Sequence, residues 1–451
     1  MVEKTDVQSI LDLSVKKLDE LEFDDYIINT ERSNRSQLRF SDNQITIAKN
    51  WASMNISVYA IKESKTVATF FEDISNETIT NTLESLHKLA NALPPNQNYY
   101  GISDGPFSYP NIEFLLDPEF LDFHDQSIDK VESAIRAAEN EGAKRSAGVL
   151  VWDVSENQIL SSRGAKAKTN STAFDFNIRS FVDEKSSGYG STVGRLSSKL
   201  DFEGAGKDAG RIAKMSIGGI NGEPGKYNVI FAPKVGANIV GATPEAANPF
   251  SVEIGQSWLK DKIGEKIGSD FVSVYDDALL PNGLGSRIFD EEGHPTGRSI
   301  IIEKGILKGF IHNTSTAKKA GTTSTGNAGL VAPENTNIFF EPGEHSFEEL
   351  LEITKDKPTL YITNTWYTRF TSFPDGIFSS IPRDGMFLVE KGEISQPVRE
   401  LRISDTMPNI FKNIIAMGKD NKQIKKWEPP SYPIFIPHIL IEDINITAAT
   451  S

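Results

Sequence analysis

The stretch FDEEGHPTGR, residues 289–298, holds the densest set of side chains that could bind a metal ion or move a proton. Its three acids at 290–292 and His294 offer the oxygen and nitrogen ligands that zinc and hard cations take. A zinc site needs three or four ligands at one point, and His294 has no second histidine within a helical turn or two. A calcium loop spaces its oxygens at alternate positions, whereas these acids are consecutive. We therefore expect a structural turn that leads into a strand.

The other catalytic sets that the sequence could hold are incomplete. A serine hydrolase places its nucleophile in a sharp G-x-S-x-G elbow, and neither GLGSRIF nor TTSTGNAG supplies one. Without cysteine the chain has no catalytic thiol, no disulfide and no thiolate ligand for zinc. Carboxylate-pair chemistry stays open, because a sequence does not show which acids meet in space. The remaining histidines are scattered singly, and one ligand alone builds no site; they are His87, His124, His312, His345 and His438.

Composition restricts the class of partner. A chain of 451 residues is long enough for about two or three domains. The net charge is −15, and the short basic run KDNKQIKKW (419–427) is interpreted as a solvated face, so nucleic acid is not an expected partner. No apolar stretch approaches the roughly 20 residues that cross a bilayer, and the acidic, amphipathic start lacks the features of a secretion signal. We expect a cytoplasmic protein without a membrane partner.

The first part of the chain alternates between helical and strand patterns, which must position any site. Apolar residues recur at helical spacing over 7–21, 75–93 and 126–141, with Ser75 as a possible cap of the second helix. The alternation over 36–61 is typical of paired strands around the turn SDN. Strand patterns return in GVLVWDV, NQILSS and AFDFNI.

The Gly/Ser-rich stretch SSGYGSTVG, residues 186–194, is expected to be a turn or linker. It lacks the context of a dinucleotide-binding loop, because the third glycine is displaced and no apolar strand precedes it. We place the domain boundary after it, with an N-terminal α+β domain over 1–195 and a C-terminal domain over 196–451. Beyond a helix at about 201–217, short strands dominate, and the tripeptide EKG occurs twice where a glycine can reverse a hairpin. The predicted fold class is α+β, with a mixed helix and sheet domain followed by a strand-rich, antiparallel, barrel-like one.

Residues 270–329 carry a resemblance to a known family. This run, with FDEEGHPTG, EKGILKG and TGNAG in order, closely resembles the signature region of the TldD/PmbA family, whose bacterial members form a zinc peptidase complex. The resemblance continues through 384–420 to the terminal ILIEDINIT. It is weaker in the N-terminal half, where ERSNRSQLRFSDNQITIAKN is similar to the opening strands of the family.

The resemblance also indicates which kind of subunit this is. TldD-type chains of that family carry an HExxxH helix and a late cysteine as metal ligands, and TldE/PmbA-type chains lack them. Counting back from 276–277 places the HExxxH slot near 240–245, which reads VGATPE, and the late cysteine near KKWEPPSYP. Both histidines and the cysteine are missing, and Pro244 with Pro249 disfavours a continuous helix. The resemblance implies a TldE/PmbA-like chain with no metal and no other cofactor of its own.

The function that the resemblance implies is that of a helper subunit. The chain would pair with a TldD-like subunit, or with itself, in a metallopeptidase complex acting on unfolded or modified peptides. Zinc is expected on the partner, and this chain would form one wall of a chamber in which a sheet edge takes up an extended peptide. Two alternatives stay open: a self-sufficient hydrolase that uses Glu245, His294 or the acids 290–292, and a homodimeric assembly protein without catalysis.

Substrate contacts are expected from two places in the resembling region. Thr325, Gly326 and Asn327 form a TGN loop that can offer backbone amides and a side-chain amide to a peptide, although a tight turn kept for folding explains it equally well. Arg369, in NTWYTRF, is the second candidate, with a surface salt bridge as the alternative. No catalytic residue and no metal ligand is expected in this chain.

Overall fold

The computed structural model describes residues 7–425 and 432–449, in which long strands alternate with short helices. The α-helices are α1 (Val7–Glu20), α2 (Asn76–Ala92), α3 (Phe120–Asn140), α4 (Phe202–Met215), α5 (Pro233–Ile239), α6 (Thr243–Ala246), α7 (Pro249–Glu253), α8 (Thr314–Ala320), α9 (Phe347–Ile353) and α10 (Met407–Lys412), and the 3-10 turns are η1 (Ser197–Lys199) and η2 (Val240–Ala242). The strands of the first half are β1 (Asp25–Ser41), β2 (Gln44–Lys62), β3 (Lys65–Phe71), β4 (Arg145–Ser161), β5 (Lys166–Phe181) and β6 (Ser187–Gly194). Those of the second half are β7 (Ile220–Asn221), β8 (Gly225–Phe231), β9 (Val274–Asp277), β10 (Arg298–Glu303), β11 (Ile306–Leu307), β12 (Ile338–Phe340), β13 (Thr359–Ser372), β14 (Ile377–Glu390), β15 (Glu393–Arg399), β16 (Leu401–Thr406), β17 (Ile414–Met417), β18 (Lys422–Lys425), β19 (Pro433–Ile436) and β20 (Ile439–Ala448). The predicted α+β class is confirmed.

Several elements follow from local signals in the sequence. Ser75 caps α2, because its hydroxyl accepts the N–H of Thr78 at 3.2 Å. Asp42 and Asn43 adopt φ values of 51° and 62° in the tight turn between β1 and β2, as the SDN motif predicts. Both EKG tripeptides form the turns of hairpins, β10–β11 and β14–β15. The helix predicted from 126 begins earlier, at Phe120.

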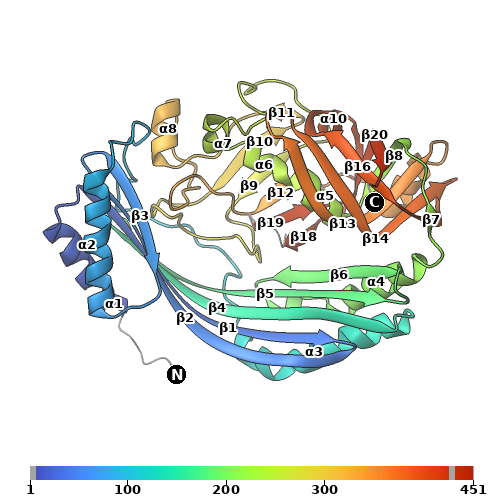
Figure 1. Ribbon diagram of the computed structural model, residues 1–451, viewed down its shortest axis with the longest axis horizontal. Coiled ribbons are helices and arrows are strands. Elements are labelled where there is room, and N and C mark those ends of the chain that lie inside the picture. The colour runs from blue at the N-terminus through green and yellow to red at the C-terminus, as the bar shows by residue number, and fades with distance from the viewer. Residues whose placement is uncertain (1–6, 426–431, 450–451) are drawn as a thin grey trace.

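The first sheet is antiparallel, in the order β3-β2-β1-β4-β5-β6. Its central strands β1 and β4 have 17 residues each, and the neighbouring β2 has 19. Twist accumulates along strands of this length, and the sheet curls around the rest of the molecule in Figure 1. The curl gives the sheet a convex outer face and a concave inner face.

Alternation along these strands decides what each face carries. Many even-numbered residues of these strands point outward and are apolar, among them Ile28, Phe40, Leu150, Phe174 and Phe176. The outer face packs on α1 and α2 at one end and on α3 and α4 along the other, as Figure 1 shows. Odd-numbered residues point inward, toward the second half of the chain.

The Gly/Ser-rich stretch at 186–194 is a strand, β6, and our prediction of a turn or linker there was wrong. Its glycines serve close packing, because a Cβ added at Gly188 or Gly190 would overlap backbone atoms of α4 at Ala209 and Ala205. Small residues on both elements bring the helix directly onto the strand. The glycines of this stretch therefore indicate close packing of a helix on a strand, and not an interruption of the strand.

The second half forms two sheets around a shared core. One has the order β11-β10-β9-β12-β19-β18, and the other runs β13-β8-β20-β16-β14-β15-β7, with β17 paired to β20. Most pairs are antiparallel, while β8–β13, β12–β19 and β7–β15 are parallel. The core between the sheets is built from buried aliphatic and aromatic residues such as Val229, Phe231, Phe340 and Ile441.

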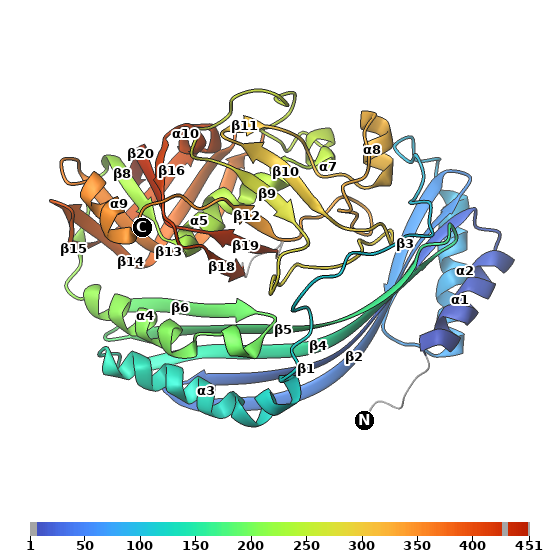
Figure 2. The ribbon, with the colours of Figure 1, turned by 180° about the vertical axis from the view of Figure 1, so that it is seen from behind.

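The first sheet wraps the second half of the chain, as the view from behind makes clear (Figure 2). Arg195, directly after β6, ties the halves together by donating to the backbone oxygens of Gly283, Leu284 and Ser286 at 2.6–2.9 Å. The domain boundary at 195/196 stays a prediction; α4, which follows it, packs on α3, β5 and β6. Among the described helices, none is long and apolar enough to cross a membrane.

Candidate functional site

A chamber of about 560 Å³ lies between the concave face of the first sheet and the second half of the chain. From the sheet, Arg35 on β1, Asn55 on β2 and Asp153 on β4 line it. From the opposite side, Arg287 and Asn335 face it. Its volume is that of an ordinary ligand site, which makes it the leading candidate for function among the described residues.

The acidic loop 289–295 borders this chamber and is built as a tight turn. The backbone N–H of Asp290 donates to the oxygen of His294 at 3.0 Å, and Gly293 has a φ of 73°. The Asp290 carboxylate accepts the N–H groups of Glu292, His294 and Ala328, each at 2.9 Å. The predicted structural turn is present, and Asp290 is the residue that holds its shape.

Asp290 and Glu292 are buried, and Glu291 is half-buried at the border of the chamber. Glu291 accepts a hydrogen bond from the Asn29 side chain at 2.6 Å. Glu292 accepts from the Ser103 hydroxyl at 3.0 Å and from the N–H of Thr314 at 3.3 Å. Burial raises the pKa of Glu291 to about 7, and burial together with the Asp290 charge raises the pKa of Glu292 to about 7. These carboxyls can therefore change charge near neutral pH.

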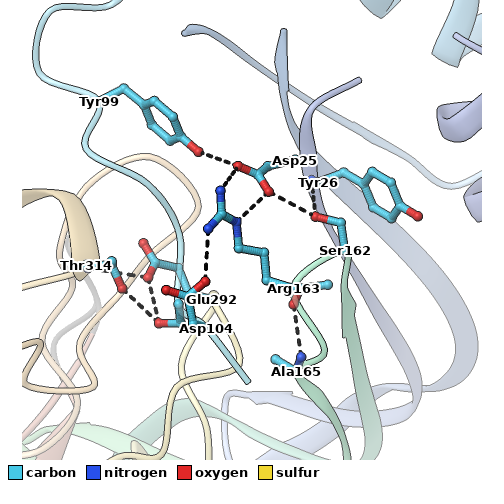
Figure 3. Close-up of polar contacts among 11 residues, drawn as sticks. Asp25, Tyr26, Tyr99, Asp104, Ser162, Arg163, Ala165, Glu292 and Thr314 are labelled. Atoms are coloured by element: carbon cyan, nitrogen blue, oxygen red, sulfur yellow. Dashed lines mark hydrogen bonds and ion pairs between the residues drawn. The ribbon is translucent and has the colours of Figure 1, made fainter. Parts of the chain in front are cut away.

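A second network, drawn in Figure 3, holds the segment that covers Glu292. Arg163 makes a two-pronged ion pair with Asp25, at 2.6 and 2.8 Å, and also binds Asp104 at 2.9 Å. Tyr99 donates its hydroxyl to Asp25 at 3.1 Å. Because Tyr99 and Asp104 flank Ser103, this network fixes the hydroxyl that reaches Glu292.

His294 contacts the main chain and an aromatic ring. Its Nδ1 lies 2.8 Å from the oxygen of Pro295, and its ring packs against Phe107 at 5.3 Å between centroids. Within residues 7–425 and 432–449, no group of three or more histidine, aspartate or glutamate side chains is arranged to hold a metal ion.

The TGN loop predicted to touch substrate turns its polar groups inward. The Thr325 hydroxyl accepts the backbone N–H of His312 at 2.7 Å and donates to the side-chain Oδ1 of Asn327 at 2.8 Å. Asn327 is 2% exposed and donates to Asp276 at 3.0 Å. Gly326 has a φ of 71° and lies against Pro295. These contacts fit the tight-turn alternative, and the substrate-binding role of the loop stays a prediction.

Arg369 lies on β13 and is not among the residues that line the chamber. It is exposed on β13, opposite Ser379 of β14. Its strand neighbour Tyr367 is also exposed, at 48%. The structure therefore does not bring Arg369 together with the chamber, and its role in substrate binding stays a prediction.

The slot at 240–245, where the resemblance places an HExxxH helix, is a broken helix. It consists of η2 and α6, and α7 starts at Pro249 after a gap. Val240 is fully buried, so the first ligand position carries an aliphatic side chain. Glu245 accepts from Asn335 at 3.2 Å and lies beside the Tyr432 hydroxyl, which donates to the oxygen of Gly241 at 2.8 Å.

The residues at this slot do not fit a zinc ion, because one aliphatic group and one hydrogen-bonded carboxylate stand where two imidazoles would be needed. Burial and the neighbouring Glu245 raise the pKa of Tyr432 well above its usual range. The position near KKWEPPSYP, where the late cysteine would fall, lies mostly outside the described residues, since 426–431 are not among them.

Sequence reasoning missed the polar inner wall of the chamber. Arg35, Asn55, Asp153 and Asn157 sit at odd positions of long strands and were absorbed into an alternating strand pattern. The sequence does contain a signal for this wall: on several strands, the alternate positions that are not apolar carry many amide and charged side chains. A polar strand face that turns to the interior, rather than to water, indicates a site.

Three domain models of one family match the chain in order. They are the PmbA/TldA metallopeptidase domain 1 over 29–90, the central domain over 121–217 and the C-terminal domain over 224–448. A metalloprotease of Methanocaldococcus jannaschii is 34% identical over 202 residues, and one of Methanothermobacter thermautotrophicus is 28% identical over 226. These alignments span 44% and 49% of this chain, and the same shares of the two relatives, so they reach about half of their length. Metalloprotease PmbA of Escherichia coli O157:H7 is 27% identical over 365 residues, 77% of each chain.

Solved structures share the fold over almost the whole chain. TldE of Thermococcus kodakarensis has a TM-score of 0.85 at 20% identity and covers 97% of this chain and 100% of its own. A Thermotoga maritima protein described as a candidate modulator of a DNA gyrase has a TM-score of 0.84 at 23% identity, covering 98% and 100%. At these identities the likeness shows the fold alone, and the family rests on the domain models, which follow one another along most of the sequence. This chain belongs to the PmbA/TldD family.

Proposed function

We propose that this chain is the subunit without a catalytic metal in a PmbA/TldD-type metallopeptidase complex that acts on unfolded or modified peptides. The observation that carries the proposal is the slot at 240–245, where Val240 and the hydrogen-bonded Glu245 stand in place of metal ligands. Several relatives bear the name metalloprotease, which supports peptide chemistry for the complex. The zinc of such a complex would be held by a TldD-like partner.

The chamber supports a role in holding substrate. It lies between the first sheet and the second half of the chain, and its volume suits a segment of a few residues. Its lining combines apolar side chains, such as Phe70 and Leu115, with charges of both signs, Arg35 and Asp153 on one wall and Arg287 and Glu291 on the other. Such a lining offers partners both to the polar main chain and to apolar side chains of a peptide.

The hairpin of β13 and β14 supports association with another chain. Tyr367 and Phe373 are 48% and 45% exposed there, and Trp366 lies under the guanidinium of Arg383 at 3.8 Å. Clusters of exposed large aromatic side chains mark protein interaction surfaces. We expect the C-terminal strand-rich half to form the contact, with a TldD-like chain or with a second copy. Two descriptions of structural neighbours name a DNA gyrase, but a net charge of −15 gives a DNA-linked role no support.

Co-expression with an HExxxH-bearing homologue from the same genome tests the proposal. We expect the pair to co-purify, to hold zinc by elemental analysis and to cleave an unfolded polypeptide, with activity lost on chelation. The chain alone should hold no stoichiometric zinc and cleave nothing. Chelator-sensitive cleavage by the chain alone would overturn the proposal. Self-association without cleavage in any preparation would instead support the homodimeric assembly protein.

The double substitution Tyr367→Glu with Phe373→Glu tests the contact surface. It should weaken association, measured by sedimentation velocity at micromolar concentration, because two carboxylates would enter an apolar interface. Leu121→Glu is the matched control, since Leu121 is 83% exposed on α3, far from that hairpin. Equal association in all three proteins would place the interface elsewhere.

A second candidate function is hydrolysis by this chain alone. Glu291 lines the chamber, and burial raises its pKa to about 7, where a carboxyl can donate or accept a proton. Cleavage by the partner-free chain that survives chelation and is lost in Glu291→Gln would support this alternative. Glu245 and His294 are less suited, because their polar atoms are engaged by Asn335 and by the Pro295 oxygen.

A further inference from the structure

The outer edge of β2 is open along the first half of the strand. β2 pairs with β1 over residues 44–61, but β3 pairs with it only over residues 56–62. The cause is length, because β3 has 7 residues and β2 has 19. Residues 44–55 therefore have β1 on one side and no strand of the described chain on the other.

This stretch is exposed to solvent as well as unpaired. Residues 46–52 are all exposed, so both faces of the strand are open there. Ile47 is 41% exposed and Trp51 37%. At the opposite end of the sheet, β6 is covered, since it packs against α4 and β18. An unpaired strand edge presents a row of free N–H and C=O groups, and another extended main chain is the group that satisfies them in order.

The edge carries few of the features that keep strands of separate molecules apart. Native proteins protect such edges with prolines, charges, bulges or a covering element. Residues 44–55, QITIAKNWASMN, contain no proline, and Lys49 is their single charge. A bulge at Thr46 disturbs the start of the stretch, whereas the register with β1 is regular from Ile47 to Asn55. Such an edge is typical of a strand that pairs with another chain.

The side chains of this edge suit a second copy of the same strand. In an antiparallel pair about a two-fold axis, one residue lies opposite its own copy. If that residue is Lys49, then Ile47 of each copy lies opposite Trp51 of the other, and aromatic side chains pair favourably with β-branched ones. Each Lys49 Nζ lies 4.9 Å from the centroid of its own Trp51 ring, which draws the two ammonium groups apart.

The same register also fits the length of the open edge. It brings the start of β2 in one copy to the region of Met54 in the other, just before β3 takes up the edge at Ile56. A register centred later in the strand would push the turn between β1 and β2 of each copy against β3. A register centred earlier would lose the contact between Ile47 and Trp51.

We propose that residues 44–55 form a docking edge for a second copy of this chain, with the two β2 strands paired antiparallel about a two-fold axis near Lys49. The first sheets of the two molecules then join into one continuous sheet. This contact involves neither the slot at 240–245 nor the hairpin of β13 and β14, so it goes beyond the proposed function. A single strand pair buries little area, and we expect weak association, with a Kd of about 10–100 µM.

The absence of cysteine from the sequence allows a cross-linking test on the full chain. Lys49→Cys has one thiol per chain, and in the proposed pair the two thiols lie directly opposite each other, within reach of a disulfide. We expect a disulfide-linked dimer after mild oxidation at about 50 µM chain, seen by non-reducing electrophoresis. Asn34→Cys is the matched control: Asn34 is exposed on β1, roughly 14 Å from its copy across three strand spacings, and should stay monomeric.

Substitutions of Trp51 test the side chains of the edge. Trp51→Lys puts a charge against Ile47 of the other copy, twice by symmetry, and should weaken self-association about tenfold in sedimentation velocity. Trp51→Phe keeps an aromatic ring there and should stay within about threefold of the parent. Urea unfolding establishes that both variants are folded, as expected at an exposed position.

The results separate this inference from the proposed function. Every measurement is repeated in the Tyr367→Glu, Phe373→Glu background, in which a contact through the hairpin is removed and the β2 contact should persist. Equal cross-linking of Lys49→Cys and Asn34→Cys would overturn the inference, as would equal self-association of the two Trp51 variants. Cross-linking of Lys49→Cys to a co-expressed TldD-like chain carrying a cysteine, but not to its own copy, would also overturn it. Each of these outcomes leaves the proposed function standing.

Discussion

Asn29 on β1 donates its side-chain amide to the carboxylate of Glu291 at 2.6 Å, across 262 positions of sequence. The same amide also reaches the backbone oxygen of Glu291 at 3.2 Å. One residue of the curled sheet thereby holds both the side chain and the main chain of the acidic turn. These two hydrogen bonds therefore fix the acidic turn to the strand that forms the chamber wall.

Replacing Asn29 should lower the stability of the folded chain. Asn29→Ala leaves the half-buried Glu291 carboxylate without this donor, and we expect a loss of about 1–3 kcal/mol in the free energy of unfolding, measured by urea denaturation. Asn34→Ala, at an exposed position of the same strand, should change stability by less than about 0.5 kcal/mol. Equal losses in the two variants would show that the hydrogen bonds from Asn29 to Glu291 do not stabilise the fold.

Stability should depend on pH through the buried acids. The folded pKa of Glu292 is about 7, raised from 4.5, so the folded chain holds more protons than the unfolded chain between these values. Stability contributed by the protonated form is thus present at low pH and is lost as the pH rises through about 4.5 to 7. Its titratable neighbours Asp290 and Tyr59 share the burial that causes the shift.

Glu292→Gln removes that titration while keeping an oxygen for Ser103 and Thr314. We expect the variant to exceed the parent in unfolding free energy by about 1–3 kcal/mol at pH 8, and by clearly less at pH 5.5. Glu113→Gln, at an exposed position, is the control and should show no such trend. A difference that is the same at both pH values would contradict the buried-acid account.

The contact between β6 and α4 predicts a severe effect from one methyl group. In Gly190→Ala the new Cβ would overlap the backbone oxygen of Ala205, and strand and helix would have to separate. We expect a loss of about 3 kcal/mol or more, or a failure to fold, as seen in thermal and urea unfolding. Gly297→Ala is the control, because an added Cβ there meets no atom within 4 Å, and it should be nearly neutral.

Arg195 should be indispensable for joining the two halves. Arg195→Met leaves the oxygens of Thr172, Gly283, Leu284 and Ser286 without their donor, and we expect a loss of about 3–5 kcal/mol. Burial lowers the pKa of Arg195 to about 10, so the guanidinium is still charged at neutral pH and makes these bonds.

The matched change on the surface is Arg136→Met, which breaks only an exposed pair with Glu132 on α3. Its cost should stay below about 0.5 kcal/mol. Calorimetry of the parent and of Arg195→Met would show whether the substitution separates the unfolding of the two halves into two transitions, as expected if the halves part. An Arg195→Met protein as stable as Arg136→Met would refute the role of this residue.

Local chemistry in the sequence was enough to place turns, caps and helices. Ser75 before α2 and the Asp42–Asn43 turn follow from side-chain acceptors and positive φ, which act over a few residues. The family also follows from the sequence, because its motif is carried by consecutive residues. The lack of metal ligands at 240–245 also follows from the sequence, because folding cannot give an aliphatic side chain the ligand chemistry of an imidazole.

Tertiary structure alone decided which groups meet. The sequence predicted the acidic turn but not its burial, because Asn29 and Ser103 reach it from 262 and 189 positions away. It predicted a break at 186–194, whereas close packing with α4 makes a strand there. The sequence of a strand does not show which part of the chain will lie opposite each of its faces. The inner wall of the chamber could therefore be identified only from the curled sheet in the structure. The physical reason is range: backbone preferences act between neighbours in sequence, while burial and electrostatics act between neighbours in space.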